Sequence, residues 1–272
     1  MVTPLELACQ RPIRPYIDVC MAELPEVQTY LETLVNVSAT PDFPHAHNGV
    51  QLTNDGFVGK IGAAVDACLP VIQQAVDAEI DFLIVHHGLF WSGVQMIEGA
   101  YYEKLKLAME HNLAIYSAHI PLDVHEVYGN NVLFAKALGL EETAPFFPWK
   151  GILLGRRAQV EGWTRAGLKV QLSDLLGSHV HCAPGGPEEI REVGIITGGA
   201  GSEVAAMAAV GIDTFITGEG PHHTYALAEE HGVNLFYAGH YATETFGVRA
   251  LAAHLGERYS VPHLFIDHPS GL

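Results

Sequence analysis

The chain predicts an α/β fold of two similar α/β/α-layered domains with mostly parallel sheets. Three observations lead to this fold class. Amphipathic helical segments alternate with short apolar runs, the alternation occurs in both halves of the chain, and 28 glycines accompany a hydrophobic content of 49% over 272 residues. Alternating strands and helices favour parallel sheets, because a parallel pair needs a crossover that a helix usually supplies. The length suffices for two ordinary domains.

The first half contains a regular series of elements. Pro70 suits the first position of a helix, and Val71, Ala75 and Ile80 share one face of the segment that follows. Gly139 is placed to end a helix that starts near Asn130. In order, the predicted elements are a helix over 70–80, a strand over 82–86, a helix over 101–111, a strand over 113–117 and a helix over 130–138.

The second half continues the alternation after a less regular segment over 140–192. The predicted strands cover 193–197, 213–217, 233–237 and 264–266, and the predicted helices cover 203–210, 224–231 and 243–259. A faint internal repeat joins the halves, since the stretch from Ile80 to Gly88 resembles the stretch from Ile212 to Gly220. Short matches of this kind also arise by chance, so a duplication and its absence both remain open. The expected domains are residues 1–126 plus 233–272, and residues 127–232.

Charge and composition exclude several classes of protein. Lys and Arg total 14 against 31 Asp and Glu, and the resulting net charge of −17 argues against nonspecific binding to nucleic acid or an anionic membrane. The N-terminal stretch has no basic segment followed by an apolar one, and no apolar run reaches membrane-spanning length. The cysteines have no CxxC spacing, which favours reduced thiols and a cytoplasmic location over a disulfide framework or a zinc ribbon; they are Cys9, Cys20, Cys68 and Cys182.

Imidazole and carboxylate groups follow three of the predicted strands. His86 and His87 end the apolar run 82–85, where open α/β sheets place their ligand sites. With sixteen histidines in the chain, such a pair is often a packed or capping residue beside a solvated one. After the next strand come His119 and Asp123, and Pro121 between them predicts a turn rather than one helical face.

The third strand end carries His240 and Glu244, which point toward one another if the following helix starts early. Taken singly, Glu244 would be a carboxylate in the first turn of a helix, and Asp123 a turn or capping residue. Together, these donors are too many for one closed structural zinc site, and they suit two metal ions bridged by a carboxylate. A shell of nitrogen and oxygen without thiolate favours Zn, Mn, Fe, Co or Ni.

Other motifs are weaker. Gly199 and Gly201 belong to a glycine-rich loop between a strand and a helix, a candidate for a phosphate cradle, although a tight turn that needs glycine is the preferred explanation. His223 is a candidate ligand for a second metal site, but we prefer a role in lining or capping a pocket. Neither Ser117 nor Ser202 lies in a nucleophile elbow, so a serine hydrolase is disfavoured.

Three motifs resemble the NGG-interacting-factor-three-like family, whose bacterial members are called dinuclear-metal-centre hexameric proteins or GTP cyclohydrolase I type 2 homologues. They are LIVHHGLFW, YSAHIPLDVHEVYGNN and YAGHYATETFGVRAL, and the resemblance spans roughly 48–140 and 193–266. It implies two divalent metal ions per chain and a toroidal homohexamer with the metal pairs facing an internal cavity. The metal ligands implied are His86, His87, Asp123, His240 and Glu244, with His119 beside them as a second-shell group or proton relay.

One departure from the family concerns an Asp-Asn-x-Gly-like stretch near the N-terminus. This chain has Ala46, His47 and Asn48 before Gly49, and the missing carboxylate weakens any mechanism that uses it. Two functions follow as alternatives. The first is a metal-dependent hydrolase acting on a small molecule, for which the family name suggests a purine nucleotide. The second is a metal-binding scaffold, regulator or metal-handling protein without turnover.

Overall fold

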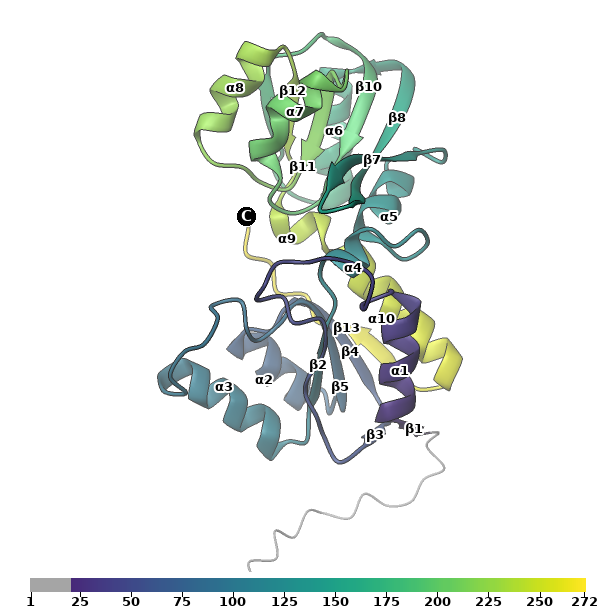
Figure 1. Ribbon diagram of the computed structural model, residues 1–272, viewed down its shortest axis with the longest axis vertical. Coiled ribbons are helices and arrows are strands. Elements are labelled where there is room, and N and C mark those ends of the chain that lie inside the picture. Colours follow the sequence, from purple (N-terminus) through teal and green to yellow (C-terminus); the bar gives the residue numbers. More distant parts are fainter. Residues whose placement is uncertain (1–20) are drawn as a thin grey trace, which may run out of the picture.

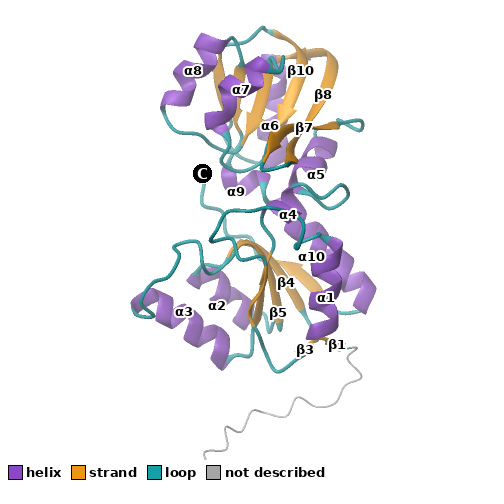
Figure 2. Cartoon of the chain, in the orientation of Figure 1, coloured by secondary structure: helices purple, strands orange, loops and turns teal. Residues whose placement is uncertain are grey.

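The computed structural model describes residues 21–272, and they form two lobes stacked along the long axis of the molecule (Figure 1). Each lobe is built on its own sheet, with helices on both sides (Figure 2). The expectations for Cys9, Cys20 and the N-terminal stretch lie outside the described residues. Among the residues described, no helix is both long and apolar enough to cross a membrane.

The first lobe contains a five-stranded sheet in the order β13-β4-β5-β6-β2, in which only the β2–β6 pairing is antiparallel. Its strands are β2 Gly49–Leu52, β4 Ile61–Asp66, β5 Phe82–His87, β6 Ala114–Ser117 and β13 His263–Phe265. A separate two-stranded ribbon pairs β1 Ala22–Glu23 with β3 Phe57–Val58. The helices are α1 Leu24–Leu34, α2 Leu69–Asp77, α3 Gly99–Glu110, α4 Ile120–Asp123, α9 His240–Thr243 and α10 Thr245–Tyr259.

Alternation along β5 divides the first lobe into three layers. Phe82 and Ile84 pack in one cluster with α1 and α10, whereas Leu83 and Val85 pack in another with α2. Successive side chains of a strand point to opposite faces, so an uninterrupted apolar run fits a sheet covered on both sides. The helices lie accordingly, with α2 and α3 on one side of the sheet and α1 and α10 on the other (Figure 1).

The second lobe contains a six-stranded sheet in the order β7-β8-β10-β11-β12-β9. Its strands are β7 Ala144–Trp149, β8 Ile152–Thr164, β9 His181–Pro184, β10 Glu189–Ile195, β11 Thr214–Thr217 and β12 Asn234–Tyr237. The helices are α5 Asn130–Ala137, α6 Arg165–Leu176, α7 Val204–Ala209 and α8 His223–His231, with a 3₁₀ turn η1 Gly201–Glu203. Ile216 and Phe236 pack against α5 and α6, and Phe215 and Leu235 pack on the other side with α7 and α8.

Parallel pairing in this sheet is confined to its centre, where β11 lies between β10 and β12. The outer pairings, β7–β8, β8–β10 and β12–β9, are antiparallel. β7 and β8 pair antiparallel because a tight turn joins them directly. Lys150 and Gly151, with φ of 46° and 90°, form the two-residue loop of a hairpin between the paired residues Trp149 and Ile152. Positive φ at both loop residues is the geometry that matches the twist of a hairpin.

The layered α/β fold predicted for the chain is therefore confirmed, and each predicted helix and strand corresponds to an observed element. Four elements of the irregular segment 140–192, namely β7, β8, α6 and β9, were not predicted, nor were the elements before residue 69. Residues 233–272 were expected to belong entirely to the first domain. In the structure, however, β12 (Asn234–Tyr237) is a strand of the second sheet. The chain returns to the first lobe only at α9. The internal duplication stays a prediction.

Candidate metal centre

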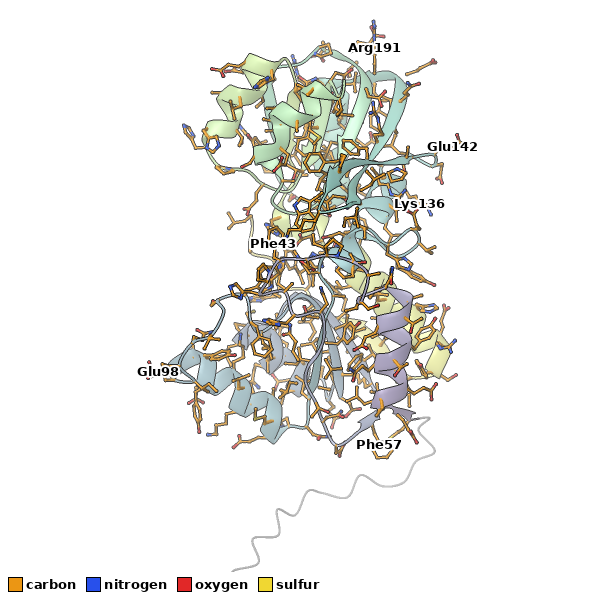
Figure 3. All side chains as sticks on the ribbon, in the orientation of Figure 1. Phe43, Phe57, Glu98, Lys136, Glu142 and Arg191 are labelled. Carbon is orange, nitrogen blue, oxygen red and sulfur yellow. The ribbon has the colours of Figure 1, made fainter. Side chains whose placement is uncertain are left out.

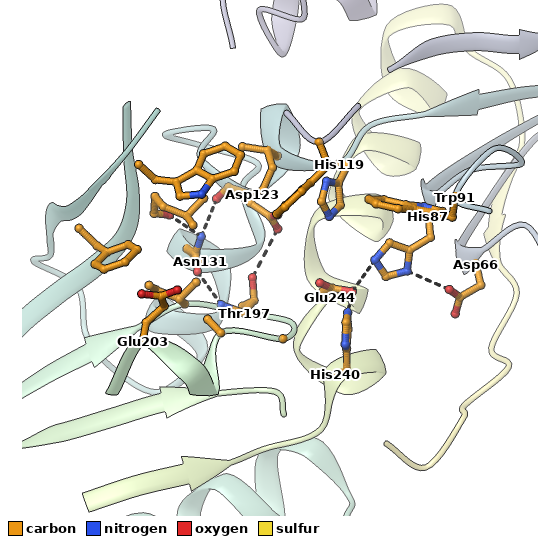
Figure 4. A pocket seen from close by; sticks show the side chains of 18 residues that line it. Asp66, His87, Trp91, His119, Asp123, Asn131, Thr197, Glu203, His240 and Glu244 are labelled. Atoms are coloured by element: carbon orange, nitrogen blue, oxygen red, sulfur yellow. Dashed lines mark hydrogen bonds and ion pairs between the residues drawn. The ribbon is translucent and has the colours of Figure 1, made fainter. Parts of the chain in front are cut away.

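The predicted donors meet where the two lobes join. His86 and His87 end β5, while His119 precedes α4 just after β6 and Asp123 is the last residue of α4. His240 begins α9 and Glu244 follows it, after β12 of the second sheet. The site therefore lies between the carboxyl ends of strands from both sheets, and not along one sheet edge. Figure 4 shows Glu244 between His87, His240 and Asp123.

The carboxylate of Glu244 is shared by two groups of donors. Its Oε1 lies 3.4 Å from His86 Nε2, which is 3.6 Å from Asp123 Oδ2. Its Oε2 lies 3.4 Å from His87 Nε2 and 3.1 Å from His240 Nε2. Within each of these triads, the potential ligand atoms all lie within 4.8 Å of one another. A third such group joins His86, His87 and His119.

In each of the four histidines, Nδ1 forms a hydrogen bond with an oxygen of a residue outside the donor cluster. His86 Nδ1 lies 2.9 Å from the carbonyl oxygen of Ala118, and His87 Nδ1 lies 2.8 Å from Asp66. These contacts turn Nε2 of both rings toward Glu244. The remaining pairs are His119 Nδ1 with Asp42 at 2.8 Å and His240 Nδ1 with Glu219 at 2.9 Å. A histidine that donates from Nδ1 to an oxygen leaves Nε2 as a ligand lone pair, the usual arrangement around a bound metal.

Two details of the local structure differ from expectation or refine it. Pro121 does not prevent a helix, because α4 is a single turn with the proline in its first turn, where a missing N–H costs nothing. His119 is the residue before that turn and Asp123 its last residue. The condition stated for the last pair is met, because α9 begins at His240, three residues before the predicted helix start at Thr243.

The electrostatics of the cluster favour charged imidazoles in the metal-free protein. Burial lowers the pKa of His86, yet the negative charges of Asp123 and Glu244 outweigh it and raise that pKa to about 10. Burial likewise lowers the pKa of His240, while the hydrogen bond and charge of Glu244 and the contact with Glu219 raise it to about 9. Divalent cations would replace these protons as the positive charge that the carboxylates require.

The other members respond to burial and to these charges. Burial raises the pKa of Asp123 despite the nearby charge of His86. Burial also disfavours the ionised form of Glu244, but His86 and His87 overcome it and hold the Glu244 pKa well below its usual value. Burial lowers the pKa of His119, and its hydrogen bond to Asp42 only partly offsets this. His119 is therefore neutral near pH 7, unlike His86.

The cluster passes a test of fit for metal ions that does not depend on any relative. His86 Nε2 and Glu244 Oε2 are buried atoms without a hydrogen-bond partner among the described residues. Buried polar atoms are normally satisfied, so two unpartnered polar atoms within one cluster of donors indicate a missing ligand. Gly198 adds to this, because a Cβ there would overlap Glu244 Oε1, and its φ of 71° disfavours other residues. The backbone thus leaves room for the Glu244 carboxylate.

Sequence reasoning missed the residues that hold the donors in place. Asp42 is the main one, because its carboxylate also accepts the backbone N–H of Ile120 at 3.0 Å and the side-chain amide of Asn48 at 2.8 Å. Asn48 in turn accepts the backbone N–H of His119 at 2.7 Å. A carboxylate thus does stand near the site, six residues before Asn48. No motif marks Asp42, Asp66 or Glu219 as partners of these rings, since only the fold brings them to the histidines.

The residues considered for phosphate binding do not form a free cradle. The backbone N–H groups of Gly198, Ala200 and Gly201 donate to Thr243 Oγ1, Thr217 Oγ1 and the carbonyl of Glu219, so they are occupied. Gly201 is buried against Gly220, whereas Gly199 does line the cavity beside the cluster. His223 starts α8 as an exposed residue and is not part of the cavity wall.

The donors open into a cavity of about 600 Å³ between the lobes. Phe43, which contributes to its wall, lies at the junction of the lobes in Figure 3. Trp91 packs edge-on to His119 with ring centroids 4.6 Å apart, and so borders the cluster directly. Phe90 and Trp91 are half-buried, and Phe146 is part of the hydrophobic core of the second lobe.

Residues 22–270 match the model of the Duf34/NIF3 (NGG1p interacting factor 3) family. The chain belongs to this family. A GTP cyclohydrolase 1 type 2 homolog of Deinococcus radiodurans is 38% identical over 252 residues, covering 91% of this chain and 94% of the relative. The resemblance drawn from the three motifs is therefore confirmed.

Solved structures of NIF3 relatives share the fold as well. A structure described as protein ybgI, of unknown function, superposes with a TM-score of 0.84 at 32% identity, covering 92% of this chain and 100% of that one. The protein TTHA1606 from Thermus thermophilus superposes with a TM-score of 0.81 at 36% identity and the same coverage. The two-lobed architecture is thus shared across nearly the whole described chain.

Proposed function

We propose that the chain is a dinuclear, metal-dependent hydrolase. One divalent ion would be held by His86, Asp123 and Glu244, and the second by His87, His240 and Glu244. The observation that carries this proposal is the position of Glu244, whose two oxygens face different donor triads. A carboxylate so placed bridges two ions and leaves each with open positions for water and substrate.

The donor set indicates which ions fit. Imidazole nitrogen and carboxylate oxygen suit Zn, Mn, Fe, Co or Ni. Two such ions per chain would lower the pKa of bound water toward neutrality and polarise the group under attack. Three protein ligands for each ion is the pattern of an open catalytic site, whereas a structural zinc site is closed by four.

The remaining residues supply orientation and a proton route. Asp42 fixes the ring of His119 through Nδ1, so Nε2 faces His86 and His87. Because burial keeps His119 neutral near pH 7, its Nε2 can accept a proton from a nucleophile and return it to a leaving group. Asn130 holds Asp123 by donating to Oδ1 at 2.8 Å, which leaves Oδ2 toward His86.

The substrate that we propose is a small molecule of nucleotide type. Support comes from the name of the curated relatives, GTP cyclohydrolase 1 type 2 homolog, and from the size of the cavity. Ring opening of a purine requires water to attack a ring carbon, and a metal pair with a neutral histidine beside it suits that step.

The assembly and its setting are part of the proposal. We expect a cytoplasmic homohexamer with its metal pairs facing an internal cavity, formed from a metal-site domain and a second domain. Exposed apolar side chains at Val94, Met96 and Ile97 offer surface for such contacts. Cys68 and Cys182 are free thiols, as a reducing compartment allows.

A combined metal and activity assay tests the proposal. The purified protein, loaded with each candidate ion, is assayed against GTP and simple phosphoesters, and metal content is determined by elemental analysis. We expect two ions per chain, turnover, and loss of turnover in Asp123→Ala with the oligomer intact. Stoichiometric metal without turnover of any substrate would instead support a metal-binding scaffold or a metal-handling protein.

A further inference from the structure

The cavity has two ends of different chemistry. At one end lie the metal donors, with His87 and Asp66, and at the other lies Glu203, on the second-lobe side of Asn131 and Thr197 (Figure 4). The proposed hydrolase mechanism uses only the first end. The second end is therefore open to a separate question, namely which part of a substrate it accommodates.

The walls at the second-lobe end are apolar. Phe147, Leu154, Ile196 and Ala200 line the cavity and belong to the same core cluster as Val204, the residue that follows Glu203. Apolar walls favour the faces of a planar ring, because ring burial removes apolar area from water and Phe147 offers an aromatic stacking contact.

Glu203 stands out among the carboxylates that line the cavity. Asp66 pairs with His87, Asp123 accepts from Asn130, and Glu244 faces the histidines. Glu203 is half-buried, and its carboxylate has no hydrogen bond or ion pair among the described residues. It borders the apolar walls as an acceptor whose oxygens are free to receive hydrogen bonds from a ligand.

Within residues 21–272, no lysine or arginine contributes to the wall of the cavity, and its histidines lie at the metal-donor end. Lys150 is nearby, but its Nζ donates to the carbonyl of Asp42 at 3.0 Å and lies 4.5 Å from the centre of the Trp149 ring. The second-lobe end therefore disfavours an anionic group and favours one that donates hydrogen bonds.

We propose that Glu203 is a specificity-determining residue that reads the donor edge of an amino-substituted heteroaromatic ring. Two parallel N–H groups on such an edge match the two oxygens of a carboxylate, while the ring faces lie against the apolar walls. The proposal rests on the proposed function, since the metal pair would act on the same molecule. It adds the substrate class, a ring with adjacent N–H and NH₂ donors, and the residue that selects it.

A binding experiment with two matched probes tests this assignment. Guanosine carries ring N–H and exocyclic NH₂ donors on one edge, and inosine lacks the NH₂. Binding of each to the zinc-loaded protein is measured by calorimetry for the wild type, Glu203→Gln and Glu229→Gln, the last changing an exposed acid of α8. We expect the wild type and Glu229→Gln to bind guanosine about tenfold or more tightly than inosine. Glu203→Gln should lose that preference while its metal content stays unchanged.

The outcomes separate this inference from the proposed function. Failure of the wild type to bind guanosine with its metals in place, or an unchanged preference in Glu203→Gln, would overturn the role of Glu203. Absence of turnover with the preference intact would overturn the hydrolase and leave ring recognition standing, because the readout here is binding.

Discussion

Replacing Asp66 by asparagine is expected to weaken one metal ion selectively. Asp66 ends β4 and is paired in the sheet with His87, and its carboxylate contacts His87 Nδ1 at 2.8 Å. Loss of such a partner typically costs a 10- to 100-fold reduction in metal affinity, about 1.4–2.8 kcal/mol. For Asp66→Asn we expect a loss of metal affinity of about tenfold, at the lower end of this range, because the amide oxygen still accepts the hydrogen bond from His87. The wild-type Asp66 side chain is also 42% exposed, so solvent already screens its charge.

The selectivity follows from the donor triads. The ion that we assign to His87, His240 and Glu244 should weaken, whereas the ion of His86, Asp123 and Glu244 should not, because His86 Nδ1 is held by the backbone of Ala118. Competition titrations with a chelator give the two affinities, and anomalous scattering identifies which position empties first.

Two further variants complete the experiment. Glu219→Gln should weaken the same ion through His240, since Glu219 contacts its Nδ1 at 2.9 Å. Asp174→Asn, an exposed site on α6, is the matched control. Equal weakening of both ions by Asp66→Asn, or no weakening of either, would refute the division into two triads sharing Glu244.

Three other predictions use the same cluster. Metal uptake near pH 7 should release about two protons, one each from His86 and His240, whose pKa values of about 10 and about 9 keep them charged without metal. Metal affinity should then rise with pH up to that range, and calorimetry in buffers of different ionisation enthalpy that gave no net release would contradict this. Gly198→Ala should lose metal and destabilise the fold by about 1–3 kcal/mol, because its Cβ meets Glu244 at a positive φ; unchanged metal content and melting temperature would be the opposite result. Asn130→Ala should lower the free energy of unfolding by about 1–3 kcal/mol in urea, because the buried carboxylate of Asp123 and the backbone N–H of Gly247 would each lose a hydrogen-bond partner. A loss under about 0.5 kcal/mol would contradict that role.

Much of the fold could be read from local patterns. The apolar run of β5 and the periodic faces of α2 and α10 specify elements by burial alone, so their existence was predictable. The segment 140–192 was not, because in β8 the adjacent Arg156 and Arg157 after Gly155 interrupt the alternation typical of a strand, and β7 contains Pro145 and Pro148. Proline is tolerated there because β7 is an edge strand, a position that no local pattern reveals.

The sequence by itself determined which side chains are candidate metal donors, since imidazole and carboxylate groups follow three of the predicted strands. Only the tertiary structure decided that β12 belongs to the second sheet, and hence that the donors meet between the lobes. It also decided that Asp42, Asp66 and Glu219 orient the histidines, and that Glu203 faces the same cavity. The physical reason is that ligand chemistry belongs to the side chain, whereas the partners of a side chain depend on packing between segments far apart in the chain.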